Sequence, residues 1–251
     1  MTTGHSNPWA DTTGLVLCGG LGTRLLPVVA DRPKGIADVG GRPFLGRLFD
    51  QVAAAGLTRT VLCTGYMAGS VQAACGDRHR GMTLAYSEEK TPLGTGGAIR
   101  VALPLVGTRD LLVLNGDSFC HADLAAFRTA YEAGGRKPML LLVDMADASR
   151  FGRVECDADG TVRKFIEKSA DTGPGLINAG VYLLPVEFAR TIPHDRAVSL
   201  EREMFPAWIS SGLRGFRCVG PFIDIGTPES YAAAPEFFAT DSDGEKLYAG
   251  T

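Results

Sequence analysis

The chain has 251 residues, of which 45% are hydrophobic and 21% charged, as in an ordinary globular protein with one large α/β domain. Its formal net charge of −3 at pH 7 argues against a protein that binds nucleic acid through bulk positive charge. No apolar run approaches the roughly 18–20 residues of a membrane span, and residues 1–13 lack the apolar core of an export signal. We therefore expect a cytoplasmic protein that binds neither nucleic acid nor a membrane.

Six cysteines are scattered through the chain without CxxC spacing, at positions 18, 63, 75, 120, 156 and 218. This pattern favours reduced, mostly buried thiols over a metal site or a disulfide framework. Both ends of the chain are polar, so residues 1–11 and 240–251 are expected to be flexible tails.

The first predicted element is a buried strand at Leu15–Leu17, and the glycines of Cys18–Leu25 form the turn that leaves it. Glycine lets a backbone approach a ligand and turn its N–H groups toward an anion, and Arg24 and Lys34 add positive charge. This predicts a phosphate site, with a plain structural turn as the alternative. The loop is not a Rossmann fingerprint, because Leu25 stands at the third glycine position, and it is not a Walker A loop.

The next segments alternate between helical and strand-like patterns. Apolar residues at helical spacing predict a helix over Phe44–Ala55 that stops at Gly56. The pattern continues with a strand over Thr60–Thr64, a helix over Val71–Cys75 and a strand over Thr83–Ser87. This order indicates a parallel sheet with crossover helices.

A second glycine loop, Pro92–Ala98, precedes a helical segment over Ile99–Leu105. Two glycine loops at strand-to-helix junctions can face each other across the carboxyl edge of a parallel sheet. Open α/β sheets bind their ligands at that edge.

The almost unbroken apolar run Asp110–Leu114 predicts a central strand, so Asp117 stands at its carboxyl end. Asp123 is better placed to cap the helix predicted over Leu124–Ala133, which leaves Asp117 available. A carboxylate beside two phosphate loops suggests Mg²⁺, and a solvated turn residue is the alternative.

The pattern changes after a strand over Pro138–Val143. Segments Arg153–Cys156 and Thr161–Ile166 flank an Asp-Gly turn, which predicts a β-hairpin. The remaining predictions are a strand over Leu176–Leu184, a helix over Leu200–Ile209 capped by Ser199, a strand over Gly215–Val219, and a helix that Thr227 caps and that ends near Phe238. We expect this half to extend the sheet in an antiparallel or mixed manner and to hold a second substrate.

Six motifs in this order resemble the sugar-1-phosphate nucleotidylyltransferases. They are Gly19–Leu25 with Pro33-Lys34, Leu93–Gly97, Asn115–Asp117, Phe165–Lys168, Asn178–Tyr182 and Asp224–Pro228. The resemblance covers residues 14–238 and is closest to the D-glycero-D-manno-heptose 1-phosphate guanylyltransferases, although Gly35 and Ser169 stand where proline is common. It implies an α/β, GT-A-like fold: a Rossmann-like mixed, mainly parallel sheet flanked by helices, with a small antiparallel sugar-binding extension.

The resemblance implies one nucleotidyltransferase domain over residues 12–239. Residues 12–145 would bind the nucleotide, and 146–239 would bind the sugar phosphate and carry the C-terminal helix. The implied partners are an NTP and a sugar 1-phosphate, which react to NDP-sugar and pyrophosphate. Because the attacking phosphate oxygen is already ionised, the protein has to position two polyanions and neutralise developing charge.

The implied catalytic residues are Arg24 for the triphosphate and departing pyrophosphate, Lys34 for the α-phosphate, and Asp117. Asp117 and Asp224 would bind the cofactor, Mg²⁺. The implied nucleotide-binding residues are Leu17, Gly19, Gly20, Gly22, Thr23, Glu88, Glu89, Gly94 and Thr95. The implied sugar-phosphate-binding residues are Gly152, Glu167, Lys168 and Asn178.

Carboxylates at Glu88 and Glu89 suit the N–H donors of guanine, which favours GTP, and heptose 1-phosphate is the favoured acceptor. An adenylyl- or thymidylyltransferase for another sugar or cyclitol 1-phosphate is the alternative, and a homo-oligomer stays open. A non-catalytic regulatory subunit is expected to lose Arg24, Lys34 or a metal carboxylate, and all are present. A metal-dependent glycosyltransferase calls for an Asp-x-Asp pair, whereas Asp117 has Asn115 and Phe119 at that spacing.

Overall fold

The computed structural model describes residues 7–167 and 173–239. The strands of the first half are β1 (Thr12–Leu17), β2 (Arg59–Thr64), β3 (Arg78–His79), β4 (Met82–Glu88), β5 (Asp110–Asn115) and β6 (Ser118–Cys120). Those of the second half are β7 (Met139–Met145), β8 (Gly152–Cys156), β9 (Val162–Glu167), β10 (Gly175–Pro185), β11 (Arg214–Cys218) and β12 (Phe222–Asp224).

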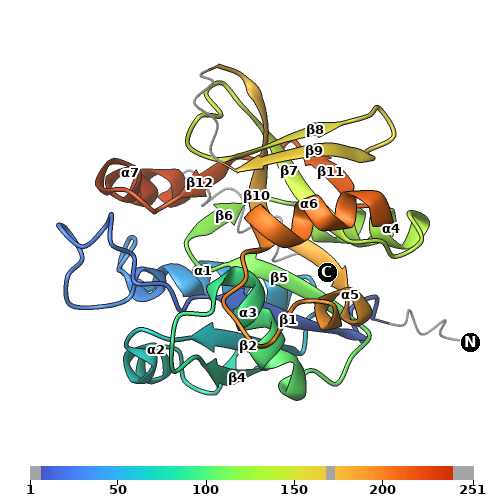
Figure 1. Ribbon diagram of the computed structural model, residues 1–251. Coiled ribbons are helices and arrows are strands. Elements are labelled where there is room, and N and C mark those ends of the chain that lie inside the picture. The colour runs from blue at the N-terminus through green and yellow to red at the C-terminus, as the bar shows by residue number, and fades with distance from the viewer. Residues whose placement is uncertain (1–6, 168–172, 240–251) are drawn as a thin grey trace, which may run out of the picture.

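Within the described residues, one sheet runs through both halves of the chain in the order β11-β7-β10-β5-β1-β2-β4-β3 (Figure 1). Strands β5, β1, β2 and β4 are parallel neighbours, whereas β10 is antiparallel to both β5 and β7. The β8–β9 hairpin extends the sheet beside β10, and β6 pairs separately with β12. The predicted mixed, mainly parallel sheet is therefore confirmed.

The α-helices are α1 (Phe44–Ala54), α2 (Ala68–Cys75), α3 (Gly94–Ala102), α4 (Leu124–Ala133), α5 (Val186–Arg190), α6 (Phe205–Trp208) and α7 (Pro228–Ala239). Short helical turns cover Lys34–Ile36, Leu103–Leu105 and Ile209–Ser211, and Leu200–Met204 forms a π-helix. No helix in these described segments combines the length and the apolar character needed to cross a membrane.

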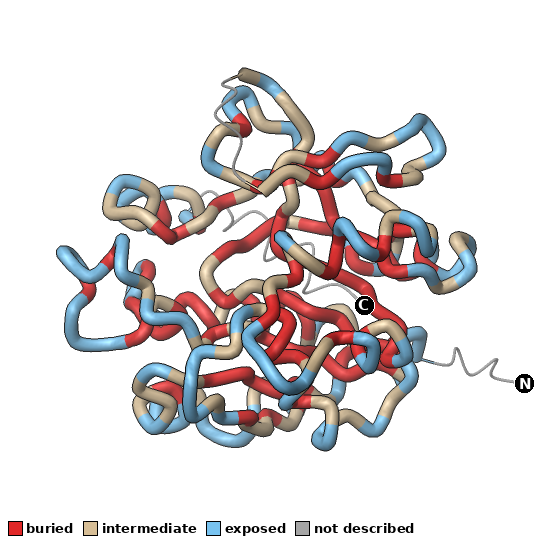
Figure 2. Tube along the Cα trace, viewed as in Figure 1, coloured by how far each residue is buried: buried red, intermediate tan, exposed pale blue. Residues whose placement is uncertain are grey.

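The central strands consist almost entirely of buried residues (Figure 2), and their side chains belong to two separate apolar clusters. Neighbouring residues of β1 point to opposite sides, so Val16 belongs to one apolar cluster and Leu15 to the other. Val16 packs in a cluster with residues of α1 and α4, and Leu15 in a cluster with residues of α3 and α6. Cover on both faces explains why these strands read as unbroken apolar runs.

Local signals placed several helix boundaries well. Asp123 caps α4 as predicted, because its Oδ1 accepts the Ala126 N–H at 2.8 Å. Ser199 caps the segment predicted over Leu200–Ile209 by accepting the Arg202 N–H at 3.2 Å, although the first turn is π-helical. Thr227 caps α7 by accepting the Ser230 N–H at 3.3 Å.

The N-terminal expectation needs a correction at residues 7–11. Trp9, expected in a flexible tail, is only 1% exposed and joins the apolar cluster under β1. The Arg128 guanidinium lies 5.7 Å from its ring centroid, and Asn7 Nδ2 donates to Gly56 O at 2.7 Å. A large aromatic surface buried in this way outweighs the polarity of its neighbours. Residues 1–6 and 240–251 of the predicted tails lie outside the described residues.

All six cysteines are free thiols, four of them buried and two half-buried, in agreement with the expected reduced state. The sulfur atoms of Cys120 and Cys218 lie 3.6 Å apart. A hydrogen bond from Cys120 lowers the pKa of the Cys218 thiol to about 6.

A buried ionic cluster fixes the start of β5 against α4. Asp110 is 1% exposed and accepts hydrogen bonds from Arg128 Nη1 at 2.9 Å and from the Tyr131 hydroxyl at 2.8 Å. Arg136 also pairs with this carboxylate. Breaking one partner of a buried ion pair is costly because it leaves the other charge uncompensated.

We expect Asp110→Asn to lower the free energy of unfolding by about 3–5 kcal/mol. Urea denaturation should show a lower midpoint with an unchanged slope. Asp157→Asn is the control, since Asp157 pairs with Arg163 on the surface and its loss should leave the midpoint unchanged. A wild-type midpoint for Asp110→Asn would contradict the structural role given to this cluster.

Candidate active site

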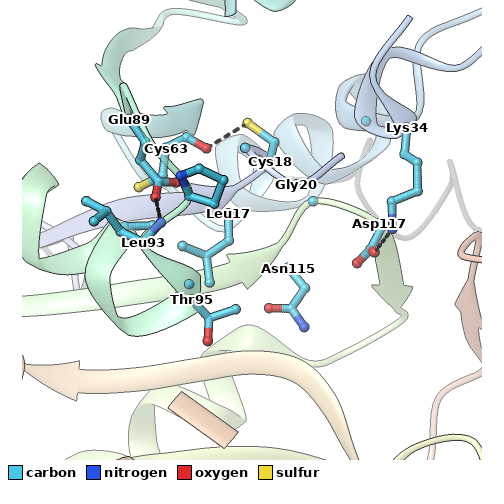
Figure 3. A pocket seen from close by; sticks show the side chains of 16 residues that line it. Leu17, Cys18, Gly20, Lys34, Cys63, Glu89, Leu93, Thr95, Asn115 and Asp117 are labelled. Carbon is cyan, nitrogen blue, oxygen red and sulfur yellow. Dashed lines mark hydrogen bonds and ion pairs between the residues drawn. The ribbon is translucent and has the colours of Figure 1, made fainter. Parts of the chain in front are cut away.

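The carboxyl ends of β1 and β5 bring the first glycine turn and the Asn115–Asp117 segment together. Leu17 and Asn115 are paired across the two parallel strands, and the Gly116 N–H donates to Leu17 O at 2.9 Å. The N-terminus of α3 lies beside them. A cavity of about 300 Å³ opens at this edge (Figure 3).

Residues from both predicted glycine motifs line this cavity. The predicted nucleotide and catalytic residues in its wall are Leu17, Gly19, Gly20, Lys34, Glu89, Gly94, Thr95 and Asp117. The other lining residues are Cys18, Gly35, Cys63, Pro92, Leu93, Ala98, Asn115 and Gly116. The expected meeting of the two motifs at one sheet edge is thus what the structure contains.

Lys34 and Asp117 form an ion pair in the cavity wall. Lys34 Nζ lies 2.5 Å from Asp117 Oδ2, and the two side chains are 18% and 28% exposed. Gly22 packs on the lysine stem: a Cβ at Gly22 would lie 2.7 Å from Lys34 Cγ, and its φ of +62° favours glycine. Gly22, predicted to touch the nucleotide, lies outside the cavity lining and makes room for the Lys34 side chain.

The β6–β12 ladder places Asp224 beside Asp117. Asp224 is paired with Ser118, and the Ile225 N–H donates to Asp117 O at 2.8 Å. Burial raises the pKa of Asp224, and the nearby Asp117 carboxylate raises it further. The Gly226 N–H, Lys34 and Arg24 act in the opposite direction.

Arg24 and Thr23 are exposed and lie outside the cavity lining. The Arg24 guanidinium nevertheless reaches the Asp224 segment, because its Nη2 lies 3.3 Å from the position of a Cβ on Gly226. Asp224 therefore has two cations in its surroundings, Lys34 and Arg24.

Glu88 and Glu89, at the carboxyl end of β4, lie in different surroundings. Glu89 lines the cavity, and its Oε2 accepts the Leu93 N–H at 2.9 Å. The pKa of Glu89 is raised, because the effect of burial exceeds the opposite effect of this hydrogen bond. Glu88 is exposed and is absent from the cavity lining, because successive residues of a strand point in opposite directions.

The second glycine motif is the first turn of α3 rather than a loop before it. A Cβ at Gly94 would lie 2.5 Å from Val198 O, and the Gly96 N–H donates to that same oxygen at 2.9 Å. Thr95 Oγ1 donates to Glu201 Oε2 at 2.7 Å. Gly94, Gly96 and Thr95 therefore contact Val198 and the π-helix. From the sequence, Gly94 and Thr95 were expected to contact the nucleotide.

Three of the predicted sugar-phosphate residues, Gly152, Glu167 and Asn178, are absent from the lining of this cavity. Gly152 and Glu167 face each other across the β8–β9 hairpin. Asn178 stands at an irregularity in β10, where its Nδ2 donates to the Tyr182 hydroxyl at 2.9 Å and its Oδ1 accepts the Gly180 N–H at 3.0 Å. Lys168 lies outside the described residues.

The donor set for a metal ion is small. Among the described residues, no group of three or more His, Cys, Asp or Glu side chains could hold a metal alone. Asp117 lines the cavity beside Lys34, and Asp224 lies next to Asp117. Mg²⁺ commonly takes one or two protein carboxylates and completes its shell with water and substrate phosphates, so this pair fits it.

Ligands of open α/β sheets bind at this edge, and exposed glycine backbone beside a lysine suits a phosphate group. The fold and cavity thus define an α/β protein of the nucleotide-binding class. The chain belongs to the nucleotidyl transferase family, whose model matches residues 13–241. The family predicted from the six motifs is confirmed.

Two relatives and one solved structure are similar over most of the chain. The mannose-1-phosphate guanylyltransferase of Mycobacterium tuberculosis is 36% identical over 86% of this chain, which spans 62% of that protein. The D-glycero-alpha-D-manno-heptose 1-phosphate guanylyltransferase of Campylobacter jejuni is 35% identical over 86% of this chain and 96% of its own length. HddC from Yersinia pseudotuberculosis, solved in complex with GMP-PN, is 34% identical with a TM-score of 0.79, covering 90% of this chain and 99% of HddC.

Proposed function

We propose that this nucleotidyltransferase transfers GMP from GTP to a sugar 1-phosphate, giving a GDP-sugar and pyrophosphate. Heptose 1-phosphate is the favoured acceptor, and mannose 1-phosphate comes second, in line with the two relatives named above. The observation that carries the proposal is the cavity itself, which has Glu89 and Leu93 in one part and the Lys34–Asp117 pair in another.

The guanine base would lie toward Glu89. A carboxylate can accept hydrogen bonds from guanine N1–H and N2–H₂ together, a pattern that adenine and thymine do not offer. Glu89 Oε2 accepts the Leu93 N–H with one lone pair, so Oε1 and the second lone pair of Oε2 would accept the two donors of the base. Gly19, Gly20 and the backbone at Gly94 would contact the rest of the nucleotide.

Positive charge and carboxylates would act on the phosphates. Lys34 would stabilise the charge that builds on the α-phosphate in the transition state, and Arg24 would neutralise the β- and γ-phosphates and the leaving pyrophosphate. Asp117 and Asp224 would hold Mg²⁺, which supplies Lewis-acid stabilisation of phosphate charge. Lys34, held by Asp117, is orientated before substrate binds.

The sugar phosphate would bind in residues 146–239, which form one nucleotidyltransferase domain with the nucleotide half at 12–145. Glu167 and Gly152 would contact it from the β8–β9 side, and Lys168 would bind its phosphate. Asn178 would contribute less, because both ends of its carboxamide already bind protein groups. The free thiols agree with a reducing, cytoplasmic location.

The test is a panel of sugar 1-phosphates against five nucleoside triphosphates, with pyrophosphate release as the readout. We expect GTP with heptose 1-phosphate to give the highest kcat/KM. Turnover of dTTP or ATP without turnover of GTP would overturn the base assignment. Nucleotide-sugar binding without pyrophosphate release from any pair would favour a regulatory subunit.

A further inference from the structure

Asn115 is a cavity residue that the motif analysis left without a role of its own. It is the last residue of β5 and is paired with Leu17 of β1. Its side chain lines the same cavity as Glu89 and Lys34. In Figure 3 it lies between Leu93 on one side and the Lys34–Asp117 pair on the other.

The two ends of the Asn115 carboxamide have different surroundings. The buried Tyr182 hydroxyl accepts a hydrogen bond from Asn178 Nδ2 at 2.9 Å, and the Asn115 side chain acts on the same hydroxyl by lowering its pKa. Gly180 leaves room for this contact, because a Cβ there would lie 2.8 Å from Asn115 Nδ2. Asn115 Oδ1 is buried and has no hydrogen-bond partner among the residues that the structure describes.

A buried acceptor without a partner is uncommon in native proteins, and in a cavity wall it marks the place of a ligand donor. The position along the cavity limits what that donor can be. In a nucleotide whose base faces Glu89 and whose phosphates face Lys34, the ribose lies between them. Its hydroxyls both donate and accept, so they match either end of a carboxamide.

The acceptor sugar is a weaker match for this oxygen. The predicted sugar residues Gly152, Glu167 and Asn178 do not line the cavity that Asn115 lines. The residues around Asn115 in the wall come from the two glycine motifs and the Lys34–Asp117 pair instead. The place of Asn115 in the cavity wall therefore favours a donor of the nucleotide over a donor of the sugar.

We propose that Asn115 binds a ribose hydroxyl of the nucleoside triphosphate. This hydrogen bond positions the nucleotide and selects it over the analogue that lacks the hydroxyl. This inference rests on the proposed nucleotidyl transfer from GTP. Close packing of Asn115 against Gly180 limits the positions of its carboxamide, so the hydrogen-bond acceptor is placed before the nucleotide arrives.

The experiment compares kcat/KM for GTP, 2′-deoxy-GTP and 3′-deoxy-GTP in the wild type and in Asn115→Leu. A neutral hydrogen bond corresponds to about three- to tenfold, so the wild type should disfavour one deoxy analogue by that factor. Asn115→Leu should bring that ratio close to one, mainly by losing activity with GTP. The analogue affected identifies the hydroxyl. Ratios that are the same in both proteins for both analogues overturn the proposal.

Two further variants separate recognition from a general structural effect. Asn115→Asp keeps an acceptor oxygen and should retain discrimination even where turnover falls. Asn7→Leu removes the same carboxamide at a site far along the chain and should leave the ratio unchanged. If Asn115→Leu does not fold, Asn115→Ala serves in its place.

Calorimetric titration of the same three nucleotides, without acceptor, separates failure of this inference from failure of the proposed function. If the wild type binds GTP more tightly than one deoxy analogue but releases no pyrophosphate, the proposed reaction is refuted and the role of Asn115 is kept. Normal pyrophosphate release with equal affinities for all three nucleotides refutes the role of Asn115 alone.

Discussion

Replacing Lys34 by alanine is expected to lower kcat/KM for pyrophosphate release on the order of 10³-fold, mostly through kcat. Lys34 Nζ is held 2.5 Å from Asp117 Oδ2 in the cavity wall, so its charge is fixed in place before substrate binds. A fixed cation stabilises the charge that develops at phosphorus more than the charge of the ground state. Loss of such an interaction lowers kcat, whereas loss of simple substrate binding raises KM.

The measurement is steady-state kinetics on purified Lys34→Ala, with circular dichroism to confirm the fold. Lys137→Ala is the matched control, because Lys137 is an exposed lysine outside the cavity lining and should keep wild-type kinetics. If Lys34→Ala raises KM and leaves kcat unchanged, Lys34 binds the ground state and its proposed role in the transition state is wrong.

The strands could be predicted because burial on both faces leaves a strong sequence signal. The run Asp110–Leu114 lies within β5, and the hairpin around the Asp-Gly turn became β8 and β9. The ladder of β6 and β12 was missed, since strands of three residues carry too little pattern to be detected. It is this ladder that brings Asp224 to Asp117.

The glycine motifs predicted the location of the site more accurately than the role of each glycine. A missing Cβ can make room for a ligand or for another part of the protein, and the sequence is the same in both cases. Gly20 lines the cavity with nothing described within 4 Å of its Cβ position, as a ligand-facing glycine should. Gly94, in contrast, contacts Val198, which is distant in sequence, and Gly22 contacts Lys34 across a turn. Only the folded structure distinguishes these uses.

The role of Asn115 was hidden for a related reason. In the sequence, Asn115 belongs to a motif in which Asp117 is the residue with an evident chemical role, that of a metal ligand. Its importance arises from Tyr182 and Gly180 on β10, the neighbouring antiparallel strand. A partner that lies far along the chain leaves no local pattern around Asn115 itself.

Removal of divalent metal is expected to abolish pyrophosphate release, and Asp224→Asn is expected to lower kcat/KM roughly 10²-fold at a fixed Mg²⁺ concentration. The β6–β12 ladder sets Asp117 and Asp224 side by side, and their mutual repulsion contributes to the raised pKa of Asp224. Two carboxylates held together in this way favour a divalent cation. Because Lys34 also neutralises Asp117, loss of the Asp224 charge should weaken the affinity for Mg²⁺ most directly.

A Mg²⁺ titration of pyrophosphate release after chelation checks this in the wild type, Asp224→Asn and Asp123→Asn. The last variant removes one carboxylate nearby in sequence to Asp117 while keeping a side chain that caps α4 well, so its titration should match the wild type. Asp224→Asn should need a higher Mg²⁺ concentration for half-maximal activity, since one ligand charge is lost. An unchanged midpoint would place the metal elsewhere, because a carboxylate that binds the ion cannot be neutralised without weakening its hold.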